Sequence, residues 1–530
     1  MKQLWTNGVI YTMENEWEVV QAVLVESGKI LATGTLDNLQ PLADEIIDLQ
    51  GMTMYPGFVD SHLHMIGHGE KLKRLDLTKA KSGEQLLQLI GEAVNKLEPG
   101  QWLIGDGWNE NQFTDGAIPT IEQLDTVTSN PVYLNRICHH VALVNSAALE
   151  QANISVTTQD PKGGKFGRSE DGQLNGLLYE QAMNSVSETF QQQGEAYIES
   201  LVHSLELAIA DMQRYGLTGG HTEEMGYFGE YTNPLTAYQR TVGEHKNFRV
   251  NLLRHHSVFE QMNEQHAAFN EPFIEPGAMK FYADGSFGGS TAALLEPYAN
   301  DATNKGMLIH TNEQIETLVQ LARKYNEAVA IHLIGDAGVE QVLTYLEKYP
   351  VPQGKRDRLI HCCYISDSQL QRIKKLPVIL DLQPAFVTSD FPWVLEKLGH
   401  HRKGHVYAWK TFIEEGLICA AGTDAPIEAI SPFETIYAAV ERKKNTDTHD
   451  GYAPEQKLTR YEAVKMYTFG SAQAICKEHE RGLIKEGFDA DFTILDFDLL
   501  TCTPEEILQA TALKTVVAGK IVYEKCSFTN

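Results

Sequence analysis

The sequence predicts an α/β fold: a distorted TIM (β/α)8 barrel, a small β-sandwich domain built from both termini, and an inserted cap subdomain. Three observations support this prediction. Apolar strand-like segments alternate with helical stretches through the middle of the chain, which is typical of repeated βα units. Both ends are rich in short strands, and an unusually long interval separates the first two barrel strands.

The barrel is predicted from eight apolar segments, the number of strands that closes this fold. They occupy residues 58–64, 217–223, 249–257, 278–284, 328–334, 358–365, 377–383 and 417–425. A chain of 530 residues is long enough for such a barrel with insertions. We therefore assign residues 56–479 to the barrel.

The two ends of the chain are predicted to form one small β domain. Residues 1–55 contain strand-like runs such as LWTNGVIYT, and residues 480–530 contain similar runs such as KTVVAGKIVYEK. Gly and Asn between such runs favour the tight turns of an antiparallel sheet. We expect the termini to meet in a composite β-sandwich domain of residues 1–55 and 480–530.

A long insert is predicted between the first and second barrel strands, at about residues 70–210. It contains its own strand-like segment, PVYLNRI at 131–137, and a Gly-rich, charged stretch at 159–176 that favours a hairpin or a mobile flap. An ordinary loop inside a domain is far shorter than this interval. We therefore predict a separate subdomain that caps the mouth of the barrel.

Composition and charge exclude several classes of protein. Hydrophobic residues make up 42% and charged residues 22% of the chain, which is typical of a globular protein. The formal net charge of −27, from 44 basic and 71 acidic residues, disfavours nucleic acid and anionic membrane partners. The 7 cysteines form no CxxC pair, and the sequence has no secretory signal and no apolar run of about 18 residues. We expect a cytoplasmic protein with a small-molecule substrate, and leave a homodimer open.

Metal-competent side chains stand at the predicted carboxyl ends of the barrel strands, where barrel enzymes place their active sites. The first strand ends in His62-Leu63-His64. Because residues i and i+2 of a strand point to the same side, both imidazoles can reach one ion. Later strands supply Lys280, His332, His361 and Asp424. Imidazole and carboxylate ligands suit zinc and similar metals.

Each of these residues also has a purely structural interpretation. A single histidine at a strand end is commonly a hydrogen-bonded core residue. Asp424, in the segment GTDAP, could cap the start of a helix, and Lys280 could pair with a carboxylate such as Asp284. Their joint occurrence in barrel order favours a metal site over a set of unrelated structural residues.

Five segments carry a family resemblance. Together GFVDSHLHM, KFYADGS, AIHLIGD, LIHCC and AAGTDAPI resemble the amidohydrolase superfamily, and more narrowly its branch of large metal-dependent hydrolases that includes N-substituted formamide deformylases. The resemblance covers nearly the whole chain, including GFDADFTILD, where the chain returns to the predicted β-sandwich.

This resemblance implies a site with two divalent metal ions, for which zinc is the expected metal. His62, His64 and Asp424 would hold the more buried ion. His332 and His361 would hold the second ion.

The resemblance also implies how the site works. Lys280 would be carboxylated by carbon dioxide, and its carbamate would bridge the two ions; with an unmodified Lys280, a single-metal site is the alternative. A hydroxide bridging the ions would attack the substrate, and Asp424 would take its proton and pass it to the departing amine. We therefore expect a metal-dependent hydrolase that cleaves a non-peptide amide C–N bond of a small molecule.

Four further residues are candidates for contact with the substrate. Trp108 and His140 lie in stretches of the insert that face the pocket in the resembled branch, although both could be structural. His221 closes the second strand and is expected to point to the mouth, and Asp284 follows the strand-four lysine and could orient it or bind substrate. Relatives commonly carry Arg where this chain has Ser290, which puts substrates with a carboxylate in doubt.

Other functions stay open at this point. A deaminase of the same superfamily usually has a Glu three residues after the strand-five histidine, but this position is Gly335 and the nearest carboxylate is Asp336. An ester, lactone or phosphotriester hydrolase could use the same two-metal site. A metal-binding scaffold without turnover is the alternative of another class, although such proteins usually lose ligands and this chain keeps all six.

Overall fold

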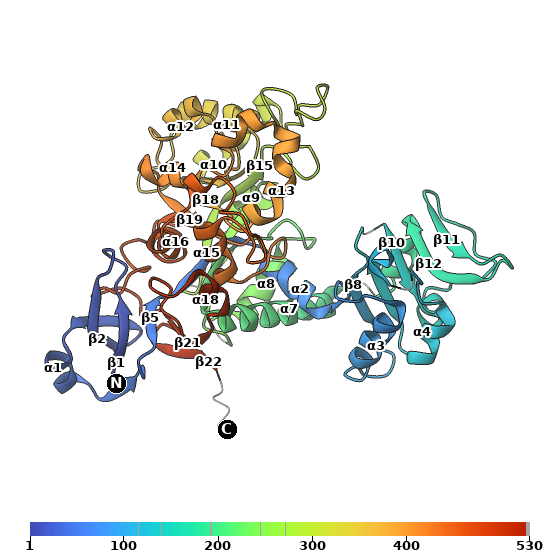
Figure 1. Cartoon of the computed structure of the whole chain (residues 1–530), viewed down its shortest axis with the longest axis horizontal. Coiled ribbons are helices and arrows are strands. Elements are labelled where there is room, and N and C mark those ends of the chain that lie inside the picture. The colour runs from blue at the N-terminus through green and yellow to red at the C-terminus, as the bar shows by residue number, and fades with distance from the viewer. Residues whose placement is uncertain (115, 139, 191–192, 244, 271, 526–530) are drawn as a thin grey trace. The chain divides into compact units, whose positions relative to one another are not determined.

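The computed structural model describes residues 1–525 except 115, 139, 191–192, 244 and 271 (Figure 1). The chain divides into two compact units. One unit comprises Met1–His68 together with the chain from Ala208 onward, and the other is Gly69–Leu207.

The first unit contains a nearly closed parallel barrel, which confirms the predicted fold class. Eight strands of the described chain follow the order β19-β18-β17-β16-β15-β14-β13-β6, and each hydrogen-bonded pair of neighbours is parallel. All eight lie in or overlap the segments predicted from the sequence. Their bounds are Phe58–Leu63 (β6), Leu217–Glu223 (β13), Arg249–His255 (β14), Ile274–Tyr282 (β15), Val329–Leu333 (β16), Asp357–His361 (β17), Val378–Leu382 (β18) and Cys419–Ala421 (β19).

Main-chain hydrogen bonds join the first and last barrel strands just beyond their carboxyl ends. The amide of Asp424 donates to the carbonyl of His62 at 2.7 Å, and the amide of His64 donates to the carbonyl of Ala425 at 2.8 Å. The two strands that begin and end the barrel sequence therefore meet at the edge where the metal-competent residues are predicted.

Burial explains why these segments become barrel strands. β17 and β18 are buried along their whole length, as expected for parallel strands covered on both faces. Helix α10 (Asn312–Lys324) is capped by Thr311 and buries Ile315, Val319 and Ala322. This spacing places the three apolar side chains on one face of the helix, and this face packs inward.

Strands from both ends of the chain share one sheet in the first unit. Its order is β22-β21-β20-β5-β1-β2-β3, and β4 pairs with β1. The ends are joined where β5 and β20 run antiparallel. The strands are Lys2–Tyr11 (β1), Val19–Glu26 (β2), Lys29–Gly34 (β3), Glu45–Asp48 (β4), Thr53–Pro56 (β5), Phe492–Leu495 (β20), Ala512–Val517 (β21) and Lys520–Glu524 (β22). The boundaries of a composite domain at 1–55 and 480–530 stay a prediction.

The second unit has its own sheet, with strand order β11-β12-β10-β9-β8-β7 among the described residues. The predicted segment 131–137 contains β9, and the stretch 159–176 leads into the antiparallel pair β11 and β12. The strands are Leu75–Asp76 (β7), Leu103–Trp108 (β8), Val132–Arg136 (β9), Val141–Val144 (β10), Gly164–Arg168 (β11) and Leu174–Glu180 (β12). That this unit caps the barrel mouth stays a prediction.

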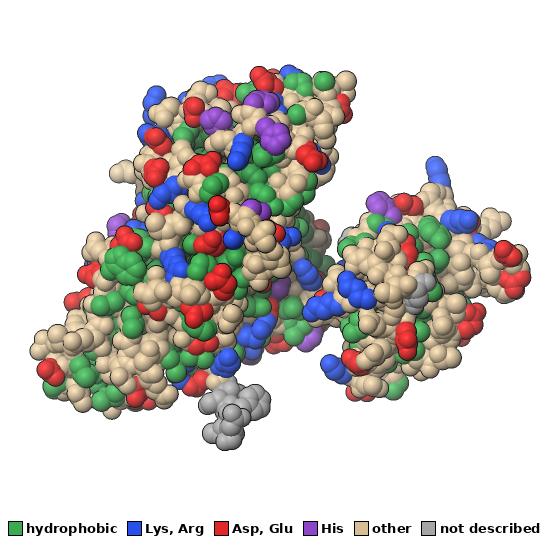
Figure 2. Space-filling model, in the orientation of Figure 1, with side chains coloured by type: hydrophobic (Ala, Val, Ile, Leu, Met, Phe, Trp, Pro, Cys, Tyr) green, Lys and Arg blue, Asp and Glu red, His purple; other side chains and the backbone are tan. Residues whose placement is uncertain are grey.

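The surface carries mixed charge in spite of the acidic total. Figure 2 shows acidic and basic side chains interspersed on the face in view. Across the described residues, no helix combines the length and the apolar character that a membrane crossing needs.

Candidate metal centre

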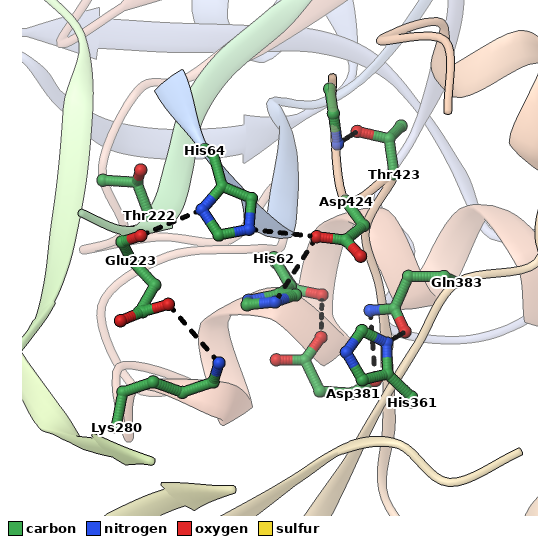
Figure 3. A network of polar contacts seen from close by, with 12 residues as sticks. His62, His64, Thr222, Glu223, Lys280, His361, Asp381, Gln383, Thr423 and Asp424 are labelled. Atoms are coloured by element: carbon green, nitrogen blue, oxygen red, sulfur yellow. Dashed lines mark hydrogen bonds and ion pairs between the residues drawn. The ribbon is translucent and has the colours of Figure 1, made fainter. Parts of the chain in front are cut away.

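Two histidines and an aspartate converge at the carboxyl ends of β6 and β19 (Figure 3). His64 Nε2 lies 3.3 Å and His62 Nε2 lies 3.7 Å from Asp424 Oδ1. One ligand atom from each residue lies within 4.8 Å of the other two. We call these three residues the Asp424 half of the site.

A second pair of histidines lies beside the first. The ring centres of His332, on β16, and His361, at the end of β17, are 4.5 Å apart, and His361 is 5.5 Å from His62. Four imidazoles from three strands therefore form one contiguous cluster with Asp424. We call His332 and His361 the His332 half.

Backbone conformation helps to direct two of these side chains. Asp424 has φ 58°, and His361 and the next residue, Cys362, have φ 74° and 48°. Non-glycine residues seldom adopt this left-handed conformation, and its cost of about 1–3 kcal/mol persists only where the surroundings impose it. Strain of this kind is typical of functional sites.

Hydrogen bonds to main-chain carbonyls fix two of the imidazoles. His64 Nδ1 donates to the carbonyl of Glu223, and His332 Nε2 donates to the carbonyl of Gly285, each at 2.9 Å. Because a carbonyl oxygen only accepts, the ring nitrogen that faces it carries a proton, and the opposite nitrogen has the lone pair whenever the ring is neutral. His64 Nε2 and His332 Nδ1 are therefore the atoms available to a metal ion.

Burial keeps most of these imidazoles neutral. It lowers the pKa of His332 to about 3, and it lowers the pKa of His62 and His361 well below the usual range, in each case with a contribution from the positive charge of Lys280. Neutral imidazole is the form that binds metal.

His64 is the exception among the four. Burial lowers the pKa of this imidazole, but the hydrogen bond and negative charge of Asp424 outweigh it and raise the pKa to about 9. Without metal, His64 therefore carries a proton that faces Asp424, in the position where a metal cation would replace it.

Lys280 lies at the end of β15 and is fully buried. Its Nζ is 3.5 Å from Glu223 Oε2 and 3.8 Å from the ring centre of Tyr282. Burial lowers the pKa of this amine, but the negative charge of Glu223 outweighs it, so the pKa is raised. The carboxylate partner of Lys280 is thus Glu223 and not Asp284.

Glu223 is a buried site residue that the sequence analysis missed. Its carboxylate accepts hydrogen bonds from the hydroxyl groups of Tyr282, at 2.9 Å, and Tyr227. Its position in the sequence could have indicated this role. Glu223 is the last residue of β13, two positions after His221 and on the same side of the strand.

His221 lies deeper than predicted. Its imidazole is 2% exposed and lines a cavity with Arg249, Asn251 and Arg481, which does not include the metal-competent cluster. Inward-facing residues two apart on a strand occupy successive layers of the barrel. Glu223 takes the layer at the carboxyl end, so the expectation that His221 points to the mouth is corrected.

Asp284 binds main-chain amide groups. Its carboxylate accepts hydrogen bonds from the amides of Ala293 at 2.9 Å, Ile334 at 3.0 Å and Gly335 at 2.7 Å. These bonds hold the loop after β15 against the end of β16. They explain its burial without contact to substrate or to Lys280.

Of the two candidates in the second unit, Trp108 is placed differently from the prediction, whereas contact of His140 with the substrate stays a prediction. Trp108 is 1% exposed, its Nε1 donates to the carbonyl of Leu134 at 3.0 Å, and it belongs to that unit's apolar core. His140 is on the surface, with Nδ1 3.0 Å from the carboxylate of Glu180. The structure therefore gives Trp108 a core role in place of the expected substrate contact.

A parallel barrel with imidazole, carboxylate and lysine side chains gathered at the carboxyl ends of its strands defines a metal-dependent hydrolase of the barrel class. The amidohydrolase family model matches residues 45–523. The chain therefore belongs to the amidohydrolase family, a class of enzymes that hydrolyse carbon–nitrogen bonds other than peptide bonds, and both the predicted resemblance and the predicted enzyme class are confirmed.

Individual relatives agree with this assignment. The chain is 43% identical to amidohydrolase YtcJ of Bacillus subtilis, over 99% of this chain and 100% of that protein. It is 26% identical to the N-substituted formamide deformylase of Arthrobacter pascens, over 98% of each chain. Among solved structures, an uncharacterized metal-dependent hydrolase from Pyrococcus horikoshii matches with a TM-score of 0.77 and 28% identity, over 95% of this chain and 99% of that chain.

Proposed function

We propose that the protein hydrolyses the C–N bond of a non-peptide amide in a small molecule, with two divalent metal ions. The convergence of the Asp424 half and the His332 half at one end of the barrel is the observation that carries the proposal. The relative named for deformylation of N-substituted formamides supports an amide as the substrate class.

The donor groups fit two ions of the zinc type. His62, His64 and Asp424 would hold one ion, and His332 and His361 the other, through imidazole and carboxylate donors that such ions prefer. When bound, the ions supply a water molecule that is acidic near neutral pH and a Lewis acid for the substrate carbonyl.

Lys280 would join the two halves as a carbamate. Two neighbours of its Nζ support this role, because each also contacts one half: Glu223, at 3.5 Å, whose carbonyl accepts a hydrogen bond from His64, and Tyr282, whose ring centre lies 3.8 Å from Nζ and 5.0 Å from the ring centre of His332. An ammonium group repels cations, whereas a carbamate offers two anionic oxygens. The proposal therefore requires carboxylation of this lysine by carbon dioxide and release from the Glu223 ion pair.

Asp424 would move the proton. Its Oδ1 faces His62 and His64, which leaves Oδ2 to take a proton from the attacking water and to return it to the amine that leaves. A carboxylate that is only 8% exposed is shielded from bulk water, so the proton is kept within the site.

One structural observation favours this reaction over deamination. Asp336, the carboxylate nearest to the position where a deaminase has Glu, accepts a hydrogen bond from the amide of Leu295 at 2.9 Å. It begins helix α11 (Asp336–Lys348), where a carboxylate stabilises the helix dipole. This structural role accounts for Asp336 without a part in catalysis.

The test combines metal analysis with substrate screening. We expect two metal equivalents per chain by mass spectrometry, a carbamate signal in ¹³C NMR after exposure to ¹³CO₂, and turnover of a member of a panel of N-formyl and N-acyl amines. Absence of metal after metal-replete expression, or equal activity in wild type, Asp424→Ala and Lys280→Ala, would overturn the proposal. Activity on esters or phosphotriesters alone would reassign the substrate class.

A further inference from the structure

The side chain of Gln383, just beyond β18, contacts one of the predicted metal ligands (Figure 3). Its Oε1 lies 2.7 Å from His361 Nδ1, and its Nε2 donates to the carbonyl of Asp381 at 3.2 Å. Gln383 and His361 are 2% and 3% exposed, so water does not compete for these bonds.

The bond to Asp381 settles which way the amide points. A carbonyl oxygen only accepts, so the group that faces it must be the NH₂ of Gln383. The amide oxygen then faces His361, and His361 Nδ1 must donate a proton to it. His361 Nε2, on the other edge of the ring, is consequently the nitrogen with a free lone pair.

Gln383 is held by a buried polar frame that reaches the other half of the site. The carboxylate of Asp381 accepts hydrogen bonds from Ser61 Oγ and from Arg358, whose Nη2 also donates to the carbonyl of Ser61 at 2.5 Å. Ser61 directly precedes His62 on β6. One frame therefore spans β6, β17 and β18, and supports a ligand of each half.

Packing restricts the His361 ring as well. The ring of Phe386 stacks on it with centres 5.8 Å apart and planes 13° from parallel. Stacking limits the tilt of the imidazole ring. It does not distinguish Nδ1 from Nε2, because the Phe386 ring forms a hydrogen bond with neither nitrogen. The choice between them must come from the hydrogen bond to Gln383.

We propose that Gln383 is a positioning residue, which selects the tautomer of His361 with a bare Nε2 and fixes its ring plane for the second metal ion. The expected effect on metal binding rests on the proposed function, because it assumes that the His332 half binds a metal ion. The tautomer itself is a property of the metal-free protein. Partners of this kind are commonly worth about 10- to 100-fold in metal affinity.

The experiment compares three variants by metal titration against a chromophoric chelator. Gln383→Met keeps an unbranched chain but removes the acceptor, and Gln383→Glu keeps an acceptor for His361. Gln369→Met is the matched control, because Gln369 is also buried, at 1% exposure, and also donates to a carbonyl, that of Asp336, at 2.7 Å. Circular dichroism melting checks that each variant folds.

We expect Gln383→Met to bind one of the two metal equivalents about 10- to 100-fold more weakly, with the other equivalent unchanged. Gln383→Glu should recover part of the loss, and Gln369→Met should bind both ions as wild type does. Equal binding of both ions by Gln383→Met and wild type would overturn the inference, as would equal losses in Gln383→Met and Gln369→Met.

A second readout separates this inference from the proposed function. ¹⁵N–¹H correlation spectra of metal-free wild type, with His361→Gln for assignment, should show a protonated Nδ1 and a bare Nε2 for His361. The opposite tautomer would overturn the inference even if two metals bind and an amide is hydrolysed. Fewer than two metal equivalents in wild type would contradict the proposed function, and the spectrum would still decide the tautomer.

Discussion

The two halves of the candidate metal centre differ in charge. The Asp424 half has its own carboxylate, which lies 3.3 Å from His64 and 3.7 Å from His62. In the His332 half, both imidazoles are oriented by neutral acceptors, the carbonyl of Gly285 and the amide of Gln383. A cation bound at the Asp424 half would therefore contact an anionic ligand of the protein. The two imidazoles of the His332 half are neutral, and Lys280 beside them adds positive charge unless it becomes a carbamate.

This difference implies unequal occupancy. We expect the Asp424 half to bind metal more tightly and without carbon dioxide, and the His332 half to bind more weakly and only when Lys280 is carboxylated.

Replacing Asp424 should have the largest effect, because this carboxylate is both a ligand and the proposed proton carrier. For Asp424→Asn we expect kcat to fall by about 10²–10⁴-fold, the usual range for a general base, with weaker metal binding at the Asp424 half. Steady-state kinetics and metal analysis measure both. Asp336→Asn is the control and should keep near wild-type rates; a comparable loss in that variant would instead support a deaminase.

Replacing Lys280 should act mainly on the His332 half, because the Asp424 half keeps a carboxylate of its own when the carbamate is lost. Lys280→Arg keeps a positive charge but cannot form a carbamate, so we expect one metal equivalent in place of two and a rate lower by about 10²-fold, as when one electrostatic stabiliser of a transition state is lost. Wild type should load its second ion better as bicarbonate is added, and the variant should not respond. Bicarbonate-independent loading of two ions in both proteins contradicts the comparison.

Metal binding at the Asp424 half should depend on pH because His64 has a pKa of about 9 without metal. Metal must displace the His64 proton, so apparent affinity should rise about tenfold per pH unit from about pH 7 to about 9 and level off above. The proton also stabilises the metal-free fold below the usual histidine pKa of about 6.5, and this contribution is lost as the pH rises through about 9. Titrations at several pH values measure the slope, and His64→Gln should remove it.

The sequence was sufficient to predict the barrel and which side chains the barrel brings together as candidate ligands. Apolar strands that are buried on both faces give a clear pattern in the sequence. The candidate ligands stand at strand ends, which the barrel geometry brings close to one another. The structure accordingly gathers His62, His64, His332, His361 and Asp424 in one cluster.

Depth inside the barrel could not be predicted in the same way. Alternation along β13 shows that His221 and Glu223 point to the same side, but the layer of the barrel that each side chain occupies depends on strand tilt and register. The role of Gln383 could not be predicted either, because a single polar residue after an apolar strand forms no distinctive sequence pattern. Trp108 was misassigned because an aromatic residue at the end of a strand suits a pocket and a core equally well.

The smallest expected effect concerns Asp284, which supports the His332 half from a distance. Its carboxylate anchors the amides of Ile334 and Gly335, and the residue after it, Gly285, accepts the hydrogen bond that orients His332. In Asp284→Asn an NH₂ replaces one acceptor, and a buried amide that loses its partner costs about 1–3 kcal/mol. We expect a lower melting temperature and a loss of second-ion affinity below the roughly tenfold that a direct partner is worth, with the Asp424 half unchanged. Equal weakening of both halves in the titration would show that the loop supports the barrel as a whole, and the independence of the two halves would then be wrong.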